Sequence, residues 1–290
     1  MFNWEFMFLE LLQNLRTDFF NKFIEFITIL GEETVYILLI CTIYFMFNKE
    51  LAKKLFFIAA TSIGFNCIIK NAVKLPRPFA NGRINCVRPH TATGYSFPSG
   101  HTQVAATCTS ALYFALKKKA LAIFSIIATL LVGFSRLYLG AHFPLDVIFG
   151  IIFGIGISFY LNRIYNKIQK KNILNLIVIL ISTIFAIAYL FEPNILFLDF
   201  YKFYGLFLGY IFATFFEAKY VNFDYNTSLF KKILRVLIGV VLAFSLKEGI
   251  KMLLQTDDLH LLYLFNVIRY FLLVAIVFGF LPLVFKKLKM

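Results

Sequence analysis

The segment from Ser135 to Asp146 contains a histidine and an aspartate at a spacing suited to nucleophilic catalysis. Asp146 follows His142 by four residues, and Pro144 between them predicts the start of a helix. One helical turn would let the carboxylate reach one imidazole nitrogen, which fixes the tautomer and leaves the other nitrogen unprotonated and nucleophilic. Arg136 adds a planar guanidinium that suits phosphate oxygens.

Two positive side chains, Lys70 and Arg77, lie upstream at the end of a long apolar run. Pro76 and Pro78 flank the arginine, exclude a helix and stiffen the chain there. Cations held on a stiff segment suit a bound oxyanion. The alternative is that both side chains reach for lipid headgroups from a helix end, as basic residues often do.

The tetrapeptide Pro98–His101 stands where a polar stretch turns into an apolar one. We expect Ser99 to be the N-cap of a helix, whose first N–H groups and positive dipole end favour an anion. Gly100 has no Cβ, so an anion can approach the backbone closely, and His101 would project beside it from the first turn. A plain capped helix with an interfacial histidine is the alternative.

Together the three segments supply three cations, a helix N-terminus, two histidines and one carboxylate. This set is suited to phosphoryl transfer, which needs charge around the phosphoryl oxygens, a nucleophile and an acid for the leaving group. Asp146 is the only acid in these motifs, so we expect chemistry that needs no metal and no cofactor. The chain lacks a GxxxxGK[ST] loop, which excludes nucleotide hydrolysis by that route.

The elements that must position these residues are membrane helices. Of the 290 residues, 60% are hydrophobic and 15% are charged, whereas soluble domains have about 45–50% and about 25%. A soluble fold cannot bury so much apolar surface, so we predict an all-α, polytopic transmembrane helical bundle. Nine apolar runs are candidate spans, at 29–47, 51–70, 99–116, 120–135, 144–162, 173–191, 200–216, 233–253 and 262–284.

The net charge of +14 is distributed in short basic clusters between these runs. Such clusters are typical of cytoplasmic loops in membrane proteins, whereas a nucleic-acid-binding protein gathers its basic residues on one solvated face. We therefore predict membrane lipids, and not nucleic acid, as partners. With all clusters on the cytoplasmic side, the three polar motifs face outward. Segment 71–98 is also basic against this rule, which a bound anion would explain.

The three motifs resemble the signature of the type 2 phosphatidic acid phosphatase superfamily, which includes membrane lipid phosphatases and soluble vanadium haloperoxidases. That signature is K-x6-RP, then PSGH, then SR-x5-H-x3-D. The resemblance covers about residues 20–162 and implies the helical core of that family, followed here by extra C-terminal membrane helices. Every signature position is matched, at Lys70, Arg77, Pro78, Pro98, Ser99, Gly100, His101, Ser135, Arg136, His142 and Asp146.

The resemblance also implies a role for each matched residue. His142 would attack phosphorus and form a phosphohistidine, and Asp146 would orient it. His101 would protonate the leaving oxygen and then activate water. The phosphoryl oxygens would be held by Lys70, Arg77, Arg136, Ser99 and the backbone N–H of Gly100.

The expected activity is that of a multi-pass lipid phosphatase of the cell membrane, with its active site on the non-cytoplasmic side. Polyprenyl diphosphate, phosphatidic acid and phosphatidylglycerol phosphate all fit as substrates. Arg83, Arg88 and His90 are candidates for a second phosphate, or they bind headgroups nonspecifically. Lipid phosphotransfer on the same site and lipid-phosphate transport without cleavage are the alternatives, and the oligomeric state is open.

Composition divides the chain into four parts. Residues 1–20 are expected to form an amphipathic segment in the membrane interface. Residues 21–162 would form the catalytic membrane domain, and 163–172 a basic cytoplasmic linker. Residues 173–290 would form a C-terminal membrane-spanning extension whose role the sequence does not indicate.

Overall fold

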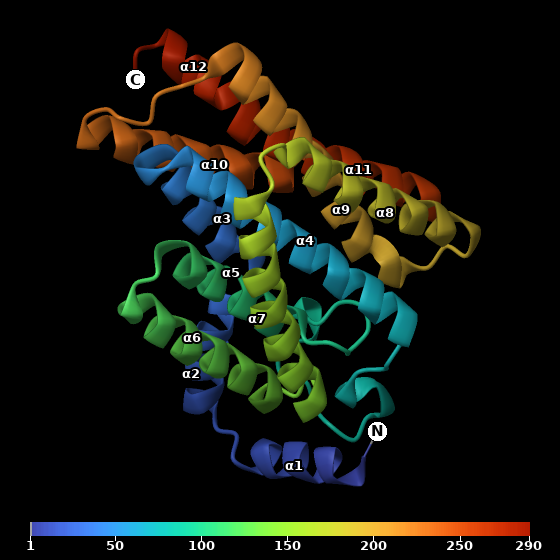
Figure 1. Cartoon of the computed structure of the whole chain (residues 1–290). Coiled ribbons are helices and arrows are strands. Elements are labelled where there is room, and N and C mark those ends of the chain that lie inside the picture. Colours follow the sequence, from blue (N-terminus) through green and yellow to red (C-terminus); the bar gives the residue numbers. More distant parts are fainter. Residues whose placement is uncertain (1) are drawn as a thin grey trace. The chain divides into compact units, whose positions relative to one another are not determined.

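The computed structural model describes residues 2–290, and every regular element in that range is a helix, as predicted (Figure 1). Short 3₁₀ and π segments extend or connect several of the α-helices. The α-helices are α1 (Asn3–Asn14), α2 (Asp18–Thr28), α3 (Glu33–Thr42), α4 (Lys49–Val73), α5 (Gly100–Leu116), α6 (Lys119–Tyr138), α7 (Pro144–Lys167), α8 (Lys171–Phe191), α9 (Leu198–Phe216), α10 (Leu229–Leu253), α11 (Leu259–Val274) and α12 (Leu281–Lys287).

The described helices form two compact units. The first unit holds the chain up to Val35 together with Thr61–Lys167, and the second holds Tyr36–Ala60 together with Ile168–Met290. Residues 36–60 therefore associate with the C-terminal helices, which composition alone does not indicate. The division of the chain at 163–172 stays a prediction.

Polar side chains join α4 to α5 inside the first unit. The hydroxyls of Ser62 and Thr107 are 2.8 Å apart, and the amide of Asn66 donates to Oε1 of Gln103 at 2.8 Å. The residues pair in reverse order, so the two helices run antiparallel. The C-terminal end of α4 consequently lies beside the N-terminus of α5.

Glycines let α7 approach α5 closely. A Cβ added at Gly150 would lie 2.9 Å from the carbonyl oxygen of Ser99, and one at Gly154 would lie 2.6 Å from Cβ of Ala106. These pairs advance together along both helices, so α5 and α7 run in the same direction. Their N-termini therefore lie at the end of the unit where α4 finishes.

The turn between α6 and α7 also requires a glycine. Gly140 has a φ of +71°, a conformation that side chains with a Cβ rarely adopt. A Cβ there would come within 2.9 Å of the carbonyl oxygen of Asn85. The turn thus packs against the loop after α4, and all three predicted motifs meet at one end of the first unit.

Six helical stretches among the described residues are long and apolar enough to cross a membrane, and a seventh arises if the pair Asp18–Gly31 and Glu33–Phe47, bent by 49°, counts as one span. The prediction of nine spans is too high by this criterion. The run at 99–116 forms α5, which has only 17 residues. The run at 233–253 lies in α10, which carries too many charged residues along its length to meet the criterion.

In the second unit, a buried carboxylate links two elements. Glu217 binds Nζ of Lys49 at 2.9 Å and Nζ of Lys53 at 2.7 Å, and its side chain is 1% exposed. Lys49 also donates to the side chain of Asn222 at 2.9 Å and to the carbonyl oxygen of Phe223 at 3.1 Å. The charges are thus matched by protein groups, which is the condition for burying them.

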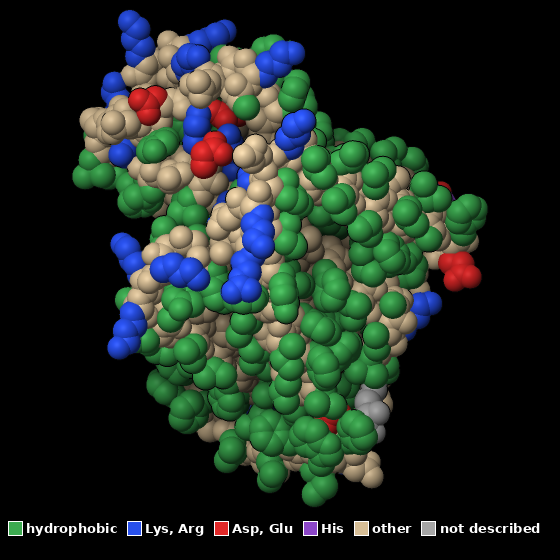
Figure 2. Space-filling model, viewed as in Figure 1, with side chains coloured by type: hydrophobic (Ala, Val, Ile, Leu, Met, Phe, Trp, Pro, Cys, Tyr) green, Lys and Arg blue, Asp and Glu red, His purple; other side chains and the backbone are tan. Residues whose placement is uncertain are grey.

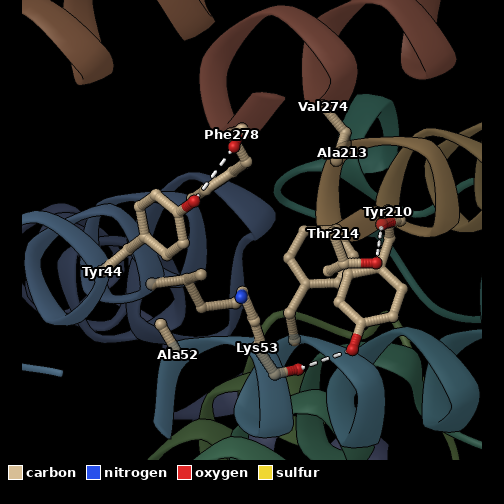
Figure 3. Close-up of a pocket in the computed structure, with 10 residues that line it drawn as sticks. Tyr44, Ala52, Lys53, Tyr210, Ala213, Thr214, Val274 and Phe278 are labelled. Carbon is tan, nitrogen blue, oxygen red and sulfur yellow. Dashed lines mark hydrogen bonds between the residues drawn. The ribbon is translucent and has the colours of Figure 1, made fainter. Parts of the chain in front are cut away.

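A small cavity lies next to this ion pair, within the same unit (Figure 3). Tyr44 and Tyr210 line it, and each phenol hydroxyl is turned to a backbone carbonyl, of Phe278 at 3.0 Å and of Lys53 at 3.1 Å. The space for a water-sized molecule is about 20 Å³, which is room for about one water. A lipid headgroup does not fit in it.

Apolar side chains cover the outside of the first unit (Figure 2). Exposed leucine, isoleucine and phenylalanine side chains lie on α6 and α7 and continue onto α1, while lysines gather at the loop between α5 and α6. This distribution is typical of helices surrounded by hydrocarbon, with charged residues at their ends.

The close approach of α5 and α7 predicts the effect of adding one methyl group. Gly154→Ala should lower the free energy of unfolding by about 1–3 kcal/mol, because the new Cβ overlaps Ala106. Gly156→Ala is the matched control, since nothing lies within 4 Å of the added Cβ. Thermal unfolding in detergent measures both, and equal midpoints for the two variants would contradict the packing described.

Candidate active site

His142 and Asp146 lie together at the start of α7, and both are buried. Oδ2 of Asp146 is 3.4 Å from Nδ1 of His142. The same oxygen accepts hydrogen bonds from the backbone N–H of Phe143 at 2.8 Å and from the hydroxyl of Ser96 at 2.5 Å. Asp146 thus caps the helix and also faces the imidazole. With the Nδ1 proton directed to this carboxylate, the lone pair of the histidine lies on Nε2.

Arg77 occupies the other side of the imidazole. Its Nη1 is 3.0 Å from Nε2 of His142 and donates to the carbonyl oxygen of Ala141 at 2.9 Å. Nε and Nη2 donate to the carbonyl oxygens of Gly94 at 3.0 Å and Thr93 at 2.5 Å. Although buried, the guanidinium is held by three backbone oxygens next to the nitrogen that carries the lone pair.

Lys70 joins this group from the last turn of α4. Nζ donates to the carbonyl oxygens of Tyr95 at 2.5 Å and Ser96 at 3.2 Å. Cε of Lys70 would lie 3.9 Å from a Cβ added at Gly100. The ammonium group therefore lies close to the N-terminus of α5, as expected for residues that bind one anion.

Arg136 presents N–H donors that no described residue accepts, and His101 presents a buried ring nitrogen without a partner among the same residues. Arg136 is completely buried, and its Nη1 donates to the hydroxyl of Thr28 at 3.0 Å. Nε and Nη2 of Arg136 and Nε2 of His101 are buried without a partner among residues 2–290. Buried polar atoms without a partner are rare in proteins. The oxygens of a phosphoryl group are the kind of acceptor that these donors need.

The start of α5 differs in one detail from the sequence expectation. Ser99 is the N-cap, but its hydroxyl pairs with the hydroxyl of Thr102 at 2.9 Å and caps no backbone N–H. The predicted side-chain cap is therefore wrong. Instead the backbone N–H of Ser99 donates to the carbonyl oxygen of Asp146 at 2.9 Å, which ties the start of α5 to the first turn of α7.

The electrostatics of the site favour a neutral imidazole and a bound anion. Burial lowers the pKa of His142 well below its usual value of 6.5, and the positive charges of Arg77, Lys70 and Arg136 act in the same direction. Among the described residues, Asp146 is the one carboxylate that contacts His142. Buried charge of one sign is costly unless an opposite charge compensates it. The arrangement is thus suited to a phosphate group.

Two further arginines of the loop after α4 have carboxylate partners. Arg83 binds Glu10 at 2.5 Å, and Arg88 binds Glu32 at 3.1 Å. These ion pairs partly neutralise the charge that was a candidate for a second phosphate, and His90 is exposed. Within residues 2–290, no group of three or more His, Cys, Asp or Glu side chains is arranged to hold a metal ion.

Two polar residues of the site were missed by sequence reasoning. Ser96 bonds Asp146, and its hydroxyl is 3.5 Å from Nδ1 of His142. Thr28 bonds Arg136 across a separation of 108 residues. Ser96 lies two residues before Pro98, so its nearness to the motif was a usable signal. No local pattern marks Thr28.

Comparison with known proteins finds relatives whose names describe phosphatases of membrane lipids. The chain is 32% identical over 131 residues to an undecaprenyl-diphosphatase of Bacillus subtilis, covering 44% of this chain and 66% of the relative. It is 36% identical over 101 residues to phosphatidylglycerophosphatase B of Bacillus subtilis, covering 30% of this chain and 50% of the relative. The matches thus span two thirds or less of these relatives.

A solved structure also aligns with part of the chain. The crystal structure of Aquifex aeolicus LpxE has a TM-score of 0.49 and 27% identity, covering 56% of this chain and 96% of that one.

Two family models match, and together they cover most of the chain. The model of the PAP2 superfamily matches residues 51–170, which include all three motifs of the site. The model described as a transmembrane extension of PAP2 superfamily phosphatases matches residues 201–290, in the second unit. The motifs, the all-helical fold and these matches agree, and the chain belongs to the PAP2 superfamily.

Proposed function

We propose that the protein hydrolyses a phosphomonoester or diphosphate of a membrane lipid. The observation that carries this proposal is the environment of His142. One imidazole nitrogen faces the carboxylate of Asp146, and the other lies 3.0 Å from the guanidinium of Arg77. Two further cations, Lys70 and Arg136, lie close enough to lower the pKa of the imidazole. A nucleophile inside a cationic cradle is what phosphoryl transfer requires.

In the proposed first step, the lone pair on Nε2 of His142 forms a bond to phosphorus. The bond between phosphorus and the leaving oxygen breaks, and His101, which enters the step as an imidazolium, gives its proton to that oxygen and becomes neutral. Asp146 accepts a hydrogen bond from the Nδ1–H group, which stays on the ring, and its negative charge offsets the positive charge that develops there. The product of the step is a phosphohistidine.

In the second step, His101 accepts a proton from water while the water oxygen attacks phosphorus. The bond between nitrogen and phosphorus breaks, which frees phosphate and restores the neutral imidazole. Arg77, Lys70 and Arg136 hold the phosphoryl oxygens throughout, because charge develops on those oxygens in both transition states. Phosphoryl oxygens that accept from Arg77 would also release Nε2, which Arg77 otherwise contacts.

The substrate proposed is a polyprenyl diphosphate or a glycerolipid phosphate such as phosphatidic acid or phosphatidylglycerol phosphate. Two observations support this choice. The relatives at 32% and 36% identity are an undecaprenyl-diphosphatase and a phosphatidylglycerophosphatase. The apolar outer faces of α6 and α7 would keep a lipid tail in the bilayer beside the site. Transfer to water needs no second lipid site, which favours hydrolysis over phosphotransfer.

Loss of the nucleophile provides the direct test. His142→Ala should reduce phosphate release from these lipids by at least about a thousandfold, because the phosphohistidine cannot form. The assay uses purified protein in detergent with a chelator, and product analysis with alcohol acceptors separates hydrolysis from phosphotransfer. His260→Ala is the matched control, since that exposed histidine lies in α11. If His142→Ala turned over at the wild-type rate, His142 would not be the nucleophile. If the wild-type protein bound the lipid without releasing phosphate, it would be a transporter.

The lowered pKa of His142 predicts the pH dependence. Burial and the positive neighbours both disfavour the imidazolium, so His142 should stay neutral, and therefore nucleophilic, below its usual pKa of 6.5. The acid limb of kcat/KM, corrected for ionisation of the substrate, should lie below pH 6.5. Arg77→Gln removes one positive charge and should raise the pKa, which shifts the limb to higher pH. Histidine ¹⁵N chemical shifts provide an independent measurement, and an imidazolium signal from His142 at pH 7 would contradict this prediction.

We also propose that the site faces the non-cytoplasmic side of the cell membrane. The support is the clustering of lysines at the opposite end of the first unit, where α5 ends and α6 begins. Single cysteines in a Cys86→Ser background report the side, because the other three cysteines are buried. Asn81→Cys should react with an impermeant maleimide in intact cells, and Lys118→Cys only after permeabilisation. The reverse labelling pattern would show that the site faces the cytoplasm and would contradict the proposal.

A further inference from the structure

Helix α1 lies across the end of the first unit that carries the site (Figure 1). Its inner face consists of the buried side chains of Glu5, Phe6, Leu9 and Leu12. The ring of Phe6 packs edge-on against that of Phe143, with 5.2 Å between the ring centres. Phe143 is the residue between His142 and the first residue of α7. The inner face of α1 therefore contacts the segment that carries the nucleophile.

Glu5 makes the polar contact between these two elements. Its Oε1 accepts a hydrogen bond from the backbone N–H of Leu145 at 3.2 Å, within the first turn of α7. The carboxylate is 3% exposed, and Leu145 immediately precedes Asp146. A carboxylate at a helix N-terminus satisfies a free N–H group and is stabilised by the helix dipole. Glu5 thus holds the turn that carries the catalytic aspartate.

Side chains farther along α1 and just beyond it hold the loop after α4. Gln13 accepts a hydrogen bond from the backbone N–H of Asn85 at 2.8 Å. Arg16 donates to the carbonyl oxygens of Asn85 at 2.5 Å and Tyr138 at 2.9 Å. These contacts connect α1 to the loop and to the end of α6, so a displaced α1 would disturb both sides of the site.

The outer face of α1 is apolar and exposed. It consists of Phe2, Trp4, Met7, Phe8 and Leu11, and Trp4 is 48% exposed. Leu15 and the exposed phenylalanines of α2, Phe19, Phe20, Phe23 and Phe26, continue this surface. Because α2 belongs to a candidate membrane span, the surface of α1 is continuous with one that hydrocarbon covers. Tryptophan at the edge of such a surface is typical of the membrane interface.

We propose that α1 binds the lipid interface with its outer face and, through Glu5 on its inner face, positions the His142–Asp146 turn, so that turnover depends on the docking of α1. This inference rests on the proposed phosphatase function for its catalytic part, whereas the docking of α1 does not. Glu5 is a positioning residue: it holds the backbone of α7 and does not contact the phosphoryl group. The partner of the outer face is the acyl-chain and headgroup boundary of the bilayer.

Trp4 reports the docking directly, because it is the only tryptophan of the chain. The chain of 290 residues is reconstituted in vesicles of phosphatidylcholine and phosphatidylglycerol with bromine at different acyl positions. Bromines near the headgroup should quench Trp4 strongly, and aqueous iodide should quench it weakly. Quenching by iodide alone overturns lipid binding. Protection from both quenchers also overturns it, because Trp4 would then lie against protein, such as a second copy of the chain.

Variants of Glu5 test the coupling to catalysis. Glu5→Ala should lower kcat about tenfold and leave KM within about twofold, because a misplaced turn slows chemistry more than binding. Glu5→Gln retains an acceptor oxygen and should recover most of the rate. Glu10→Ala is the matched control on the same helix, since its carboxylate binds Arg83 in the loop after α4, whereas that of Glu5 binds α7. A wild-type kcat for Glu5→Ala, or equal losses for Gln and Ala, would overturn the positioning role.

One variant links the two halves of the proposal. Leu11→Asp puts a charge on the outer face, at a position 64% exposed, and should reduce both the lipid quenching of Trp4 and kcat in vesicles. Reduced quenching with an unchanged kcat would overturn the coupling. A wild-type protein without phosphatase activity would instead contradict the proposed function, while the quenching of Trp4 still decides whether α1 is docked.

Discussion

Three buried cations around one imidazole are the constraint on which the rest of the site depends. Lys70, Arg77 and Arg136 are each less than a tenth exposed, and a buried cation must find oxygen acceptors. Backbone carbonyls of residues 93–96 supply them to Lys70 and Arg77. The cations therefore order the irregular loop that precedes α5, and the same loop brings Ser96 to Asp146. The cations that are placed to bind the anion thus also determine the conformation of the loop around the site.

The first turn of α7 is where the separate parts of the site are joined. Asp146 binds the N–H of Phe143 and the hydroxyl of Ser96, and its carbonyl accepts the N–H of Ser99. Glu5 accepts the neighbouring N–H of Leu145. Two N–H groups at helix starts, those of Leu145 and Ser99, thus connect α7 to α1 and to α5, and the Asp146 carboxylate adds the loop that carries Ser96. The first N–H groups of a helix have no acceptor within the helix and can bond to other segments, whereas those in its interior are already paired.

Packing between membrane helices of the first unit depends on small and hydroxylated residues. Ser110 and Ser158 join α5 to α7 with hydroxyls 2.5 Å apart, and Thr109 and Ser125 join α5 to α6 at 2.9 Å. Lipid chains are as apolar as leucine, so burial alone gives helices little preference for one another in a bilayer. Close contact and hydrogen bonds provide that preference, and they bring the N-termini of α5 and α7 to the same end as the last turn of α4.

The sequence by itself determined the helical membrane class, the three motifs and the family, because composition and residue spacing are local properties that survive without a fold. It also indicated which end of each helix carries the polar residues. It predicted nine spans, whereas six or seven helical stretches among residues 2–290 meet the length and hydropathy criterion; α5, with 17 residues, lies at the lower limit of a crossing, and α10 carries several charged residues. Only the tertiary structure decided that Thr28 bonds Arg136, that Glu5 holds α7 and that Arg83 and Arg88 are paired with carboxylates. These contacts join residues far apart in the chain. Which residues pair depends on how the helices pack, and local sequence patterns do not record that packing.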